Sequence, residues 1–160
     1  MAVKAQPDGY HSITPYLITH DAVAAIGFYK EAFGATELMR CPGPGGKVMH
    51  AEIKIGDSPI MLADEFPEMG IRSAKSYGGS PVSILIYTED VDAMFAQAIA
   101  AGAIEKKPLA DQFYGDRSGT IEDPFGHSWT IATHMEDISP EEIDRRFQEM
   151  MKQMGGGEAS

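Results

Sequence analysis

The segment Lys47–Ile55 (KVMHAEIKI) carries the side chains best suited to chemistry. Its alternation predicts a strand with His50 and Glu52 on one face and an apolar row of alanine and isoleucine on the other. Two residues apart on one face, an imidazole and a carboxylate can order a polar ligand or act as an acid/base pair. His50 and Glu52 are therefore the candidate catalytic residues. A contact between the same two side chains on a solvated sheet face remains the alternative.

A second candidate group lies around a predicted hairpin. The segment Arg117–His134 (RSGTIEDPFGHSWTIATH) predicts two strands joined by a tight turn at Asp123–Gly126, because proline and glycine occupy turn positions that favour them. Arg117 could clamp an anionic ligand with two hydrogen bonds, or pair with a neighbouring carboxylate instead. Tyr114 precedes it, and His134 at the strand end either closes a cavity or caps the strand.

The composition excludes several function classes. The 160 residues include 24 acidic and 13 basic side chains, and the net charge of −11 argues against nucleic acid or an anionic membrane as a partner. No segment approaches the roughly 18 consecutive apolar residues of a membrane span. The start, MAVKAQPDGYHS, lacks the apolar core of a signal peptide, so we expect a cytoplasmic protein. Cys41 is the only cysteine, which excludes a disulfide framework.

Two amphipathic helices separate the strand-like segments. Asp21 and Gly34 flank the first helix, and Asp90 and Gly102 flank the second, as an N-cap and a C-terminal glycine should. Ser139 begins a last helix, with proline next and glutamate three residues later. A stretch rich in Pro, Gly and Ser between the modules predicts a linker. The expected divisions are a module at 13–65, a linker at 66–80, a module at 81–136 and a helix at 139–154.

The two modules form a weak internal repeat. A shift of 68 residues places Leu17–Glu37 on Leu85–Glu105 with eight of 21 positions identical, and Gly56 falls on Gly126 at a slightly larger shift. Each half is therefore predicted to contain a strand, a helix and three further strands. Neither half is long enough to bury its helix and sheet alone, so we expect the halves to share a core.

The doubled unit and its motifs resemble a known superfamily. The segments ITPYLIT, FYKEAFGA, HAEIKIGDSPIMLADE and FYGDRSGTIEDPFGHSWTIATH, followed by SPEE, are similar to the vicinal oxygen chelate superfamily of glyoxalase and bleomycin-resistance proteins, and within it to the PhnB-like branch. The resemblance covers residues 13 to about 145. It implies an α+β fold of two βαβββ modules that form a cupped mixed sheet around a binding cavity, with a homodimer as the expected assembly.

The resemblance also implies where a metal would bind. Enzymes of the superfamily hold a divalent metal through four inward positions, one on the first strand and one on the last strand of each module. In this chain these positions fall at Ile60 and Thr130 and near Thr14 and Val82. None is His, Glu or Gln, and isoleucine or valine cannot ligate a hard cation. We therefore expect no cofactor and no metal at the usual site, with a divalent metal at a non-standard site as the alternative.

The same inward positions imply the lining of the cavity. If Ile60 and Thr130 point inward, strand alternation brings Leu62 and Asp64 to the same side. The ligand-binding residues expected from these arguments are Tyr16, Leu62, Asp64, Tyr114, Arg117, Thr130 and His134.

These features predict a protein that binds a small organic molecule without the usual metal of the superfamily. A second hypothesis is a superfamily enzyme of the lyase or isomerase type, using a relocated metal or the pair of His50 and Glu52. A third is an interaction module with a vestigial cavity. PhnB-like members have also been labelled ubiquinone methyltransferases, but this chain has no glycine-rich cofactor fingerprint after a strand to support that activity.

Overall fold

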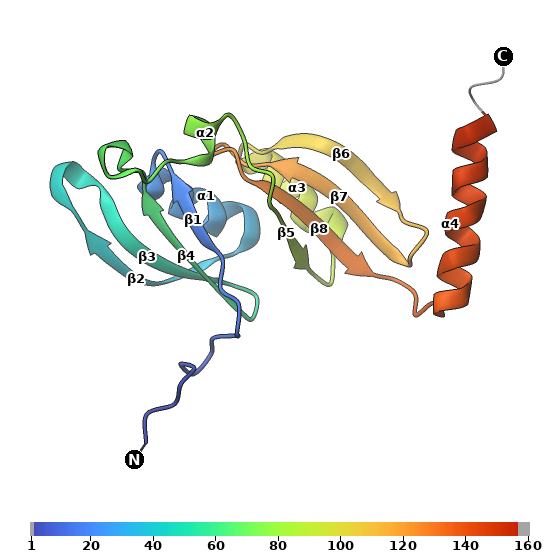
Figure 1. The fold of residues 1–160 in the computed structure, drawn as a ribbon, viewed down its shortest axis with the longest axis horizontal. Coiled ribbons are helices and arrows are strands. Elements are labelled where there is room, and N and C mark those ends of the chain that lie inside the picture. Colours follow the sequence, from blue (N-terminus) through green and yellow to red (C-terminus); the bar gives the residue numbers. More distant parts are fainter. Residues whose placement is uncertain (1, 157–160) are drawn as a thin grey trace.

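The computed structural model describes residues 2–156 and has the predicted α+β class, built as two halves (Figure 1). Each half is a four-stranded mixed sheet with one helix packed on it, α1 or α3, in the strand orders β1-β4-β3-β2 and β5-β8-β7-β6. The mixed sheet is present as two parts, and within residues 2–156 no ladder joins β1 to β5. The elements are β1 (Tyr16–Thr19), α1 (Ala22–Phe33), β2 (Thr36–Pro42), η1 (Pro44–Gly46), β3 (Val48–Ile55), β4 (Ser58–Asp64), η2 (Pro67–Met69), α2 (Ala74–Tyr77), β5 (Ser83–Tyr87), α3 (Val91–Ala101), β6 (Ile104–Asp111), β7 (Asp116–Glu122), β8 (Ser128–His134) and α4 (Pro140–Gly155).

Helices α1 and α3 begin and end where the sequence predicts. The Asp21 side chain accepts a hydrogen bond from the third residue along, and Asp90 does the same, each at 3.0 Å. Gly34 and Gly102 end the helices with φ of 65° and 119°, a left-handed conformation that glycine adopts without the steric cost of a Cβ.

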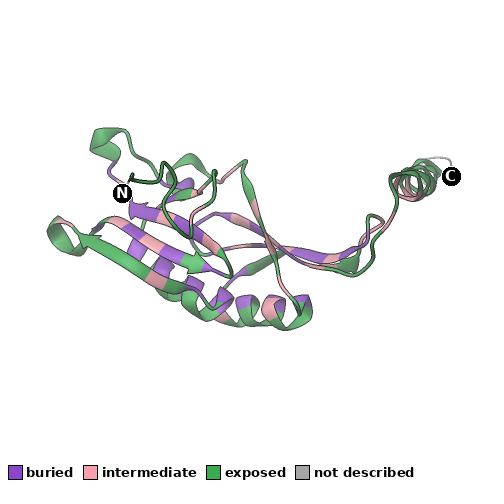
Figure 2. Cartoon of the chain, turned by 90° about the horizontal axis from the view of Figure 1, so that it is seen from below, coloured by how far each residue is buried: buried purple, intermediate pink, exposed green. Residues whose placement is uncertain are grey.

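Helices α1 and α3 pack against each other and lie on the same side of the two sheets (Figure 2). Along β1 and most of β3, buried residues alternate with more exposed ones, and the buried set faces the helices (Figure 2). The opposite side of each sheet is covered by neither α1 nor α3, and we call it the open face.

One aromatic core joins the halves. Tyr29 and Phe33 of α1 reach across to Trp129 of β8, with ring centroids 5.3 and 4.9 Å apart, and Phe125 of the β7–β8 turn packs beside Tyr29. All four side chains are buried. The halves share this core, as expected, so neither can be removed without exposing large aromatic surfaces.

The internal repeat changes register within each half. Asp21 and Asp90 cap helices that have 12 and 11 residues respectively, so the caps are 69 positions apart while Gly34 and Gly102 are 68 apart. A single shift of 68 residues therefore aligns the strands that precede the helices one residue out of register, and every side chain there is assigned to the wrong face.

The β7–β8 turn is longer than the β3–β4 turn, and this changes the register of the repeat a second time, between β4 and β8. Ile60 pairs with Ile53 on the helix side of the first sheet and corresponds to Trp129, which is also fully buried. Thr130 therefore corresponds to Met61 rather than to Ile60. The expectation that Ile60 points toward the binding face is wrong.

One further feature differs from the sequence-based predictions. The expected linker contains η2 and the short helix α2, whose Ala74 is buried. Elsewhere, Cys41 lies in β2 opposite His50. His127 is buried and contacts the carbonyl oxygen of Ile18 at 3.3 Å.

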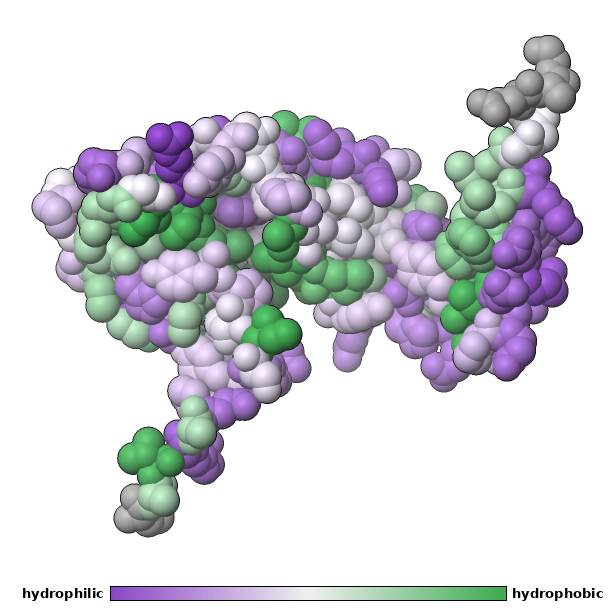
Figure 3. All heavy atoms as spheres, viewed as in Figure 1, coloured by the Kyte–Doolittle hydropathy of each residue, from purple (hydrophilic) through white to green (hydrophobic). Residues whose placement is uncertain are grey.

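The C-terminal helix α4 stands at the far end of the second half (Figure 1). Ser139 caps it by accepting a hydrogen bond from Glu142 N at 3.2 Å, as predicted. Its charged side chains face outward and its apolar ones face the body (Figure 3), where Phe147 meets Phe113 with centroids 5.6 Å apart. Within residues 2–156, no helix has the length and apolar character needed to cross a membrane.

Candidate functional site

A polar chain of side chains crosses the open face of the first half. Tyr16 Oη lies 2.8 Å from His50 Nδ1, and His50 Nε2 lies 3.1 Å from Glu52 Oε1. The neutral imidazole with its proton on Nε2 satisfies both contacts, accepting from Tyr16 and donating to Glu52. Burial raises the pKa of the Tyr16 phenol, so this hydroxyl keeps the proton that it donates. The structure thus brings together three predicted site residues.

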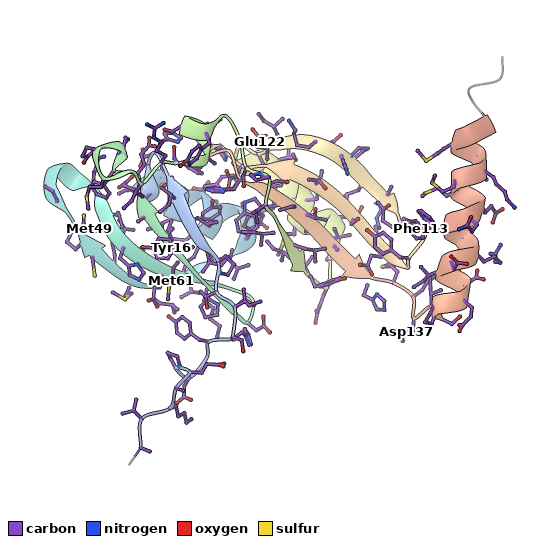
Figure 4. All side chains as sticks on the ribbon, in the orientation of Figure 1. Tyr16, Met49, Met61, Phe113, Glu122 and Asp137 are labelled. Atoms are coloured by element: carbon purple, nitrogen blue, oxygen red, sulfur yellow. The ribbon has the colours of Figure 1, made fainter. Side chains whose placement is uncertain are left out.

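The position of this chain follows from strand register. Tyr16 of β1 lies opposite Met61 of β4, which lies opposite Glu52 of β3 (Figure 4). Parity places all three on the open face, as the alternation of the Lys47–Ile55 segment predicts for Glu52. Glu52 is 15% exposed and His50 28%, so neither is a fully solvated surface group.

Tyr10 completes the polar chain from outside the sheet. Its phenol donates a hydrogen bond to Glu52 Oε2, the carboxylate oxygen that His50 does not use. Glu52 therefore accepts two hydrogen bonds, one on each oxygen. Sequence analysis missed this residue because the segment before β1 has no periodicity and Tyr10 precedes Glu52 by 42 positions.

Two apolar spaces adjoin Tyr16. A cavity of about 250 Å³ covers the open face beside β4, and a groove of about 530 Å³ runs between β1 and β5. Ligand pockets are typically about 300–1,000 Å³, so the groove lies within this range and the cavity lies just below it. The cavity is lined by Tyr16, Ile18, Met49, Ala63, Asp64, Phe66, Met69 and Ile71, and the groove by Ile13, Pro15, Tyr16, Leu17, Ser80, Val82, Ser83, Ile84, Leu85 and His127.

The open face of the second half holds a separate polar cluster. Asp116 is buried, and its two oxygens contact Tyr87 Oη at 2.8 Å and His134 Nδ1 at 2.7 Å. His134 also reaches Asp137 at 2.9 Å. The hydrogen bonds to Asp116 and then Asp137 raise the pKa of the His134 imidazole. His134 therefore lies on the open face with carboxylate partners of its own, remote in sequence and strand position from the Tyr16 chain.

The side chains of two predicted ligand-binding residues are directed away from the open face, although Asp64 also borders the 250 Å³ cavity. Leu62 is fully buried and pairs with Ala51 on the helix side. Asp64 is buried, and its two oxygens accept hydrogen bonds from Ala22 N at 2.8 Å and Val48 N at 2.6 Å. Asp64 therefore anchors the start of α1. Thr133 has the same role in the second half, where its hydroxyl accepts a 3.0 Å hydrogen bond from the first amide of α3. The predicted orientation of Leu62 and Asp64 is wrong because it was inherited from Ile60.

The remaining predicted residues are dispersed over the second half. Arg117 turns toward α3, where it makes two hydrogen bonds of 2.8 and 2.9 Å with Asp92 and a third contact with Asp111. Its guanidinium is not directed at the open face, contrary to the anion-clamp expectation. Tyr114 lies in the β6–β7 loop. Thr130 lies on the open face, where its Oγ1 is 3.1 Å from Thr120 Oγ1.

The residues at the implied metal positions do not fit a divalent metal. On the open faces, the last-strand positions are Met61 and Thr130, and the first-strand positions near Thr14 and Val82 supply neither imidazole nor carboxylate. A thioether and hydroxyls are poor ligands for a hard divalent cation. Within residues 2–156, no group of three or more His, Cys, Asp or Glu side chains is arranged to hold a metal ion.

Comparison with known proteins now decides the family. The model of the Glyoxalase/Bleomycin resistance protein/Dioxygenase superfamily matches residues 9–131. The chain belongs to this superfamily. The superfamily match ends before α4. The similarity to the Mycobacterium tuberculosis (strain H37Rv) protein Rv0887c extends further. That protein is 41% identical over 160 residues, which is 98% of this chain and 89% of that protein. The resemblance inferred from the sequence motifs is confirmed.

Several solved structures share the fold. The X-ray structure of the Arabidopsis thaliana protein At5g48480 has a TM-score of 0.64 and 31% identity, and covers 76% of this chain and 98% of its own. TioX from Micromonospora sp. ML1 has a TM-score of 0.62 and 26% identity over 78% of this chain and 99% of its own. A Bacillus cereus PhnB protein, described as a putative 3-demethylubiquinone-9 3-methyltransferase, has a TM-score of 0.59 and 19% identity over 77% and 99%, and shows the shared fold alone.

Proposed function

We propose that this protein binds a small organic molecule on the open face of its first half, with Tyr16, His50 and Glu52 as the polar anchor. The observation that carries the proposal is the position of Tyr16. Its side chain lines both the 250 Å³ cavity and the 530 Å³ groove, and its hydroxyl bonds to His50. A ligand in either space therefore meets the start of the polar chain.

The surrounding surface favours a neutral molecule with an apolar body. Met49 and Phe66 line the cavity, and thioether and aromatic groups adapt to flat apolar ligands. The overall charge of −11 and the carboxylate of Glu52 oppose an anionic ligand. The polar anchor would then fix the orientation of the ligand, while the apolar lining supplies most of the binding free energy.

A thermal-shift screen of small organic compounds tests this proposal. A ligand at 100 times its dissociation constant adds about 2.7 kcal/mol to stability, and thus raises Tm by roughly 5–10 °C for a chain of this size. Compounds that raise Tm of the wild type should lose most of the shift with Glu52→Gln. They should keep it with Glu122→Gln, which makes the same chemical change on the open face of the second half. Equal shifts in all three proteins would contradict the proposed site.

Catalysis of a proton transfer is the second candidate function. The 3.1 Å contact between His50 and Glu52 favours it, because a carboxylate can orient an imidazole for acid/base work. In that case, His50→Gln should abolish conversion of a compound found in the screen while the compound still raises Tm. Conversion that is equally fast in His50→Gln would exclude this role.

A further inference from the structure

The hydrogen bond between Tyr10 and Glu52 indicates which chemical group a ligand would need at this site. Its phenol donates to Glu52 Oε2, and the other oxygen of Glu52 accepts from His50. An ionised carboxylate only accepts hydrogen bonds, so the position that Tyr10 fills requires a donor. Ketones, ethers and carboxylates cannot replace it there. We propose that the site recognises phenols, and that the Tyr10 side chain is an internal group that a phenolic ligand displaces.

The neighbouring side chains suit an aromatic ring. Glu52 lies between Met61 and Met39 in one row across β4, β3 and β2 (Figure 4 labels Met61). Thioether sulfur makes favourable contacts with aromatic rings, worth about 0.3–1.5 kcal/mol each. Tyr16 adds an aromatic edge to the same row. The row therefore offers an acceptor for the hydroxyl and polarizable groups for the ring, which an aliphatic alcohol would use less fully.

The segment that carries Tyr10 is held weakly enough to leave. Among residues 2–13, Tyr10 is the only one that is not exposed. The one backbone hydrogen bond found within residues 2–14 joins Tyr10 N to Pro7 O at 3.2 Å, inside the segment itself. A nearby ion pair between Lys4 and Asp8 is also internal and has both side chains more than 70% exposed. Displacement of Tyr10 therefore breaks a single side-chain hydrogen bond with the sheet.

If Tyr10 competes with a phenolic ligand for Glu52, removal of the Tyr10 hydroxyl should raise the affinity for that ligand. Removal of the Tyr10 hydroxyl frees one oxygen of Glu52, so a phenol no longer has to displace a hydrogen bond in order to bind. A net hydrogen bond of about 1 kcal/mol corresponds to roughly fivefold in affinity. Tyr10→Phe should therefore bind a phenol about fivefold more tightly than the wild type. A residue that merely packs against the sheet would have no such effect.

Calorimetric titration with para-nitrophenol and nitrobenzene tests the inference, in a buffer acidic enough to keep the phenol protonated. The wild type should bind para-nitrophenol more tightly than nitrobenzene. Relative to the wild type, Tyr10→Phe should bind para-nitrophenol about fivefold more tightly, and Glu52→Gln should bind it at least tenfold more weakly. Nitrobenzene should bind all three equally. Tyr114→Phe, which removes a hydroxyl from a remote loop, should match the wild type.

The inference rests on the proposed function, and the two probes separate their failures. Equal binding of para-nitrophenol and nitrobenzene by the wild type would overturn phenol recognition while leaving a small-molecule site in place. An unchanged or weaker affinity of Tyr10→Phe for para-nitrophenol would overturn the displacement of Tyr10. Absence of binding by both probes in every protein would overturn phenol recognition, and the proposed function would fall with it only if the compound screen were also empty.

Discussion

The Tyr29 phenol of α1 donates a 2.6 Å hydrogen bond to Asp123 in the β7–β8 turn, 94 residues later in the chain. Asp123 is 1% exposed and also accepts from Trp129 Nε1 at 2.8 Å and from two turn amides at 2.9 Å. Burial, and then the charge of Asp123, raise the pKa of Tyr29 well above its usual value, so the phenol remains a donor. A single carboxylate thus fixes the turn and ties the two halves together.

Asp123→Asn should lower the free energy of unfolding by roughly 2–4 kcal/mol, because an amide nitrogen cannot accept the hydrogen bonds that one carboxylate oxygen takes from Tyr29 and Trp129. Urea unfolding measures this loss. Tyr29→Phe removes one donor and leaves three, so it should cost about 1–2 kcal/mol. A loss for Asp123→Asn no larger than that for Tyr29→Phe would contradict the role given to this carboxylate.

His134 predicts a pH-dependent stability. Its pKa is raised by hydrogen bonds to Asp116 and Asp137, so the folded state binds the proton more tightly than the unfolded chain does. The stabilisation is fully present below the unfolded-state pKa of about 6.5 and is lost as the pH rises through the raised value. His134→Gln should therefore differ more from the wild type at about pH 5.5 than at about pH 8.5 in urea unfolding. His11→Gln is the control, and an equal difference at both pH values would contradict the pairing.

Metal content is a third prediction. Because thioether and hydroxyl groups replace the expected ligands at Met61 and Thr130, protein purified without chelator should carry far less than one equivalent of Zn, Ni, Mn or Fe. Elemental analysis by plasma mass spectrometry measures this directly. One equivalent of metal that disappears in His50→Ala would contradict the prediction and point to a non-standard site at the His50–Glu52 pair.

A homodimer remains a prediction, supported by the apolar residues on the open faces. Leu85 and Tyr87 of β5 remain 47% and 62% exposed within residues 2–156. A second copy would bury such surfaces on both chains at once. Light scattering at tens of micromolar should give twice the chain mass for the wild type and the single mass for Leu85→Glu. Ile99→Glu, on the outer side of α3, should leave the mass unchanged. A wild-type monomer would contradict the prediction.

The sequence predicted the elements better than the faces of its strands. Helix caps at Asp21 and Asp90 depend on local chemistry, and the structure confirms both. Face assignments carried across the repeat failed at Leu62 and Asp64, because the β7–β8 turn is longer than the β3–β4 turn and side chains alternate with a period of two. The predicted face of Glu52 agrees with the structure, because that assignment used the alternation of side chains within β3 itself.

The rest of the candidate site depended on contacts between distant segments. Tyr10 and Glu52 come from a segment without periodicity and from β3, and no local pattern connects them. The sequence offered Arg117 a neighbouring carboxylate as a partner, but the register of β7 against β8 places the adjacent Asp116 opposite His134. Such pairs are set by sheet register, which a motif in one strand does not specify.

Binding of an organic molecule through Glu52 is tested most directly by affinity enrichment from a small-molecule extract, read by liquid chromatography and mass spectrometry. Immobilised wild type, Glu52→Gln and Glu122→Gln would be compared at equal loading. We predict that at least one organic compound is enriched by the wild type and by Glu122→Gln, and is reduced at least tenfold with Glu52→Gln. The same compounds retained by all three proteins, or none retained by any, would contradict a ligand site at Tyr16, His50 and Glu52.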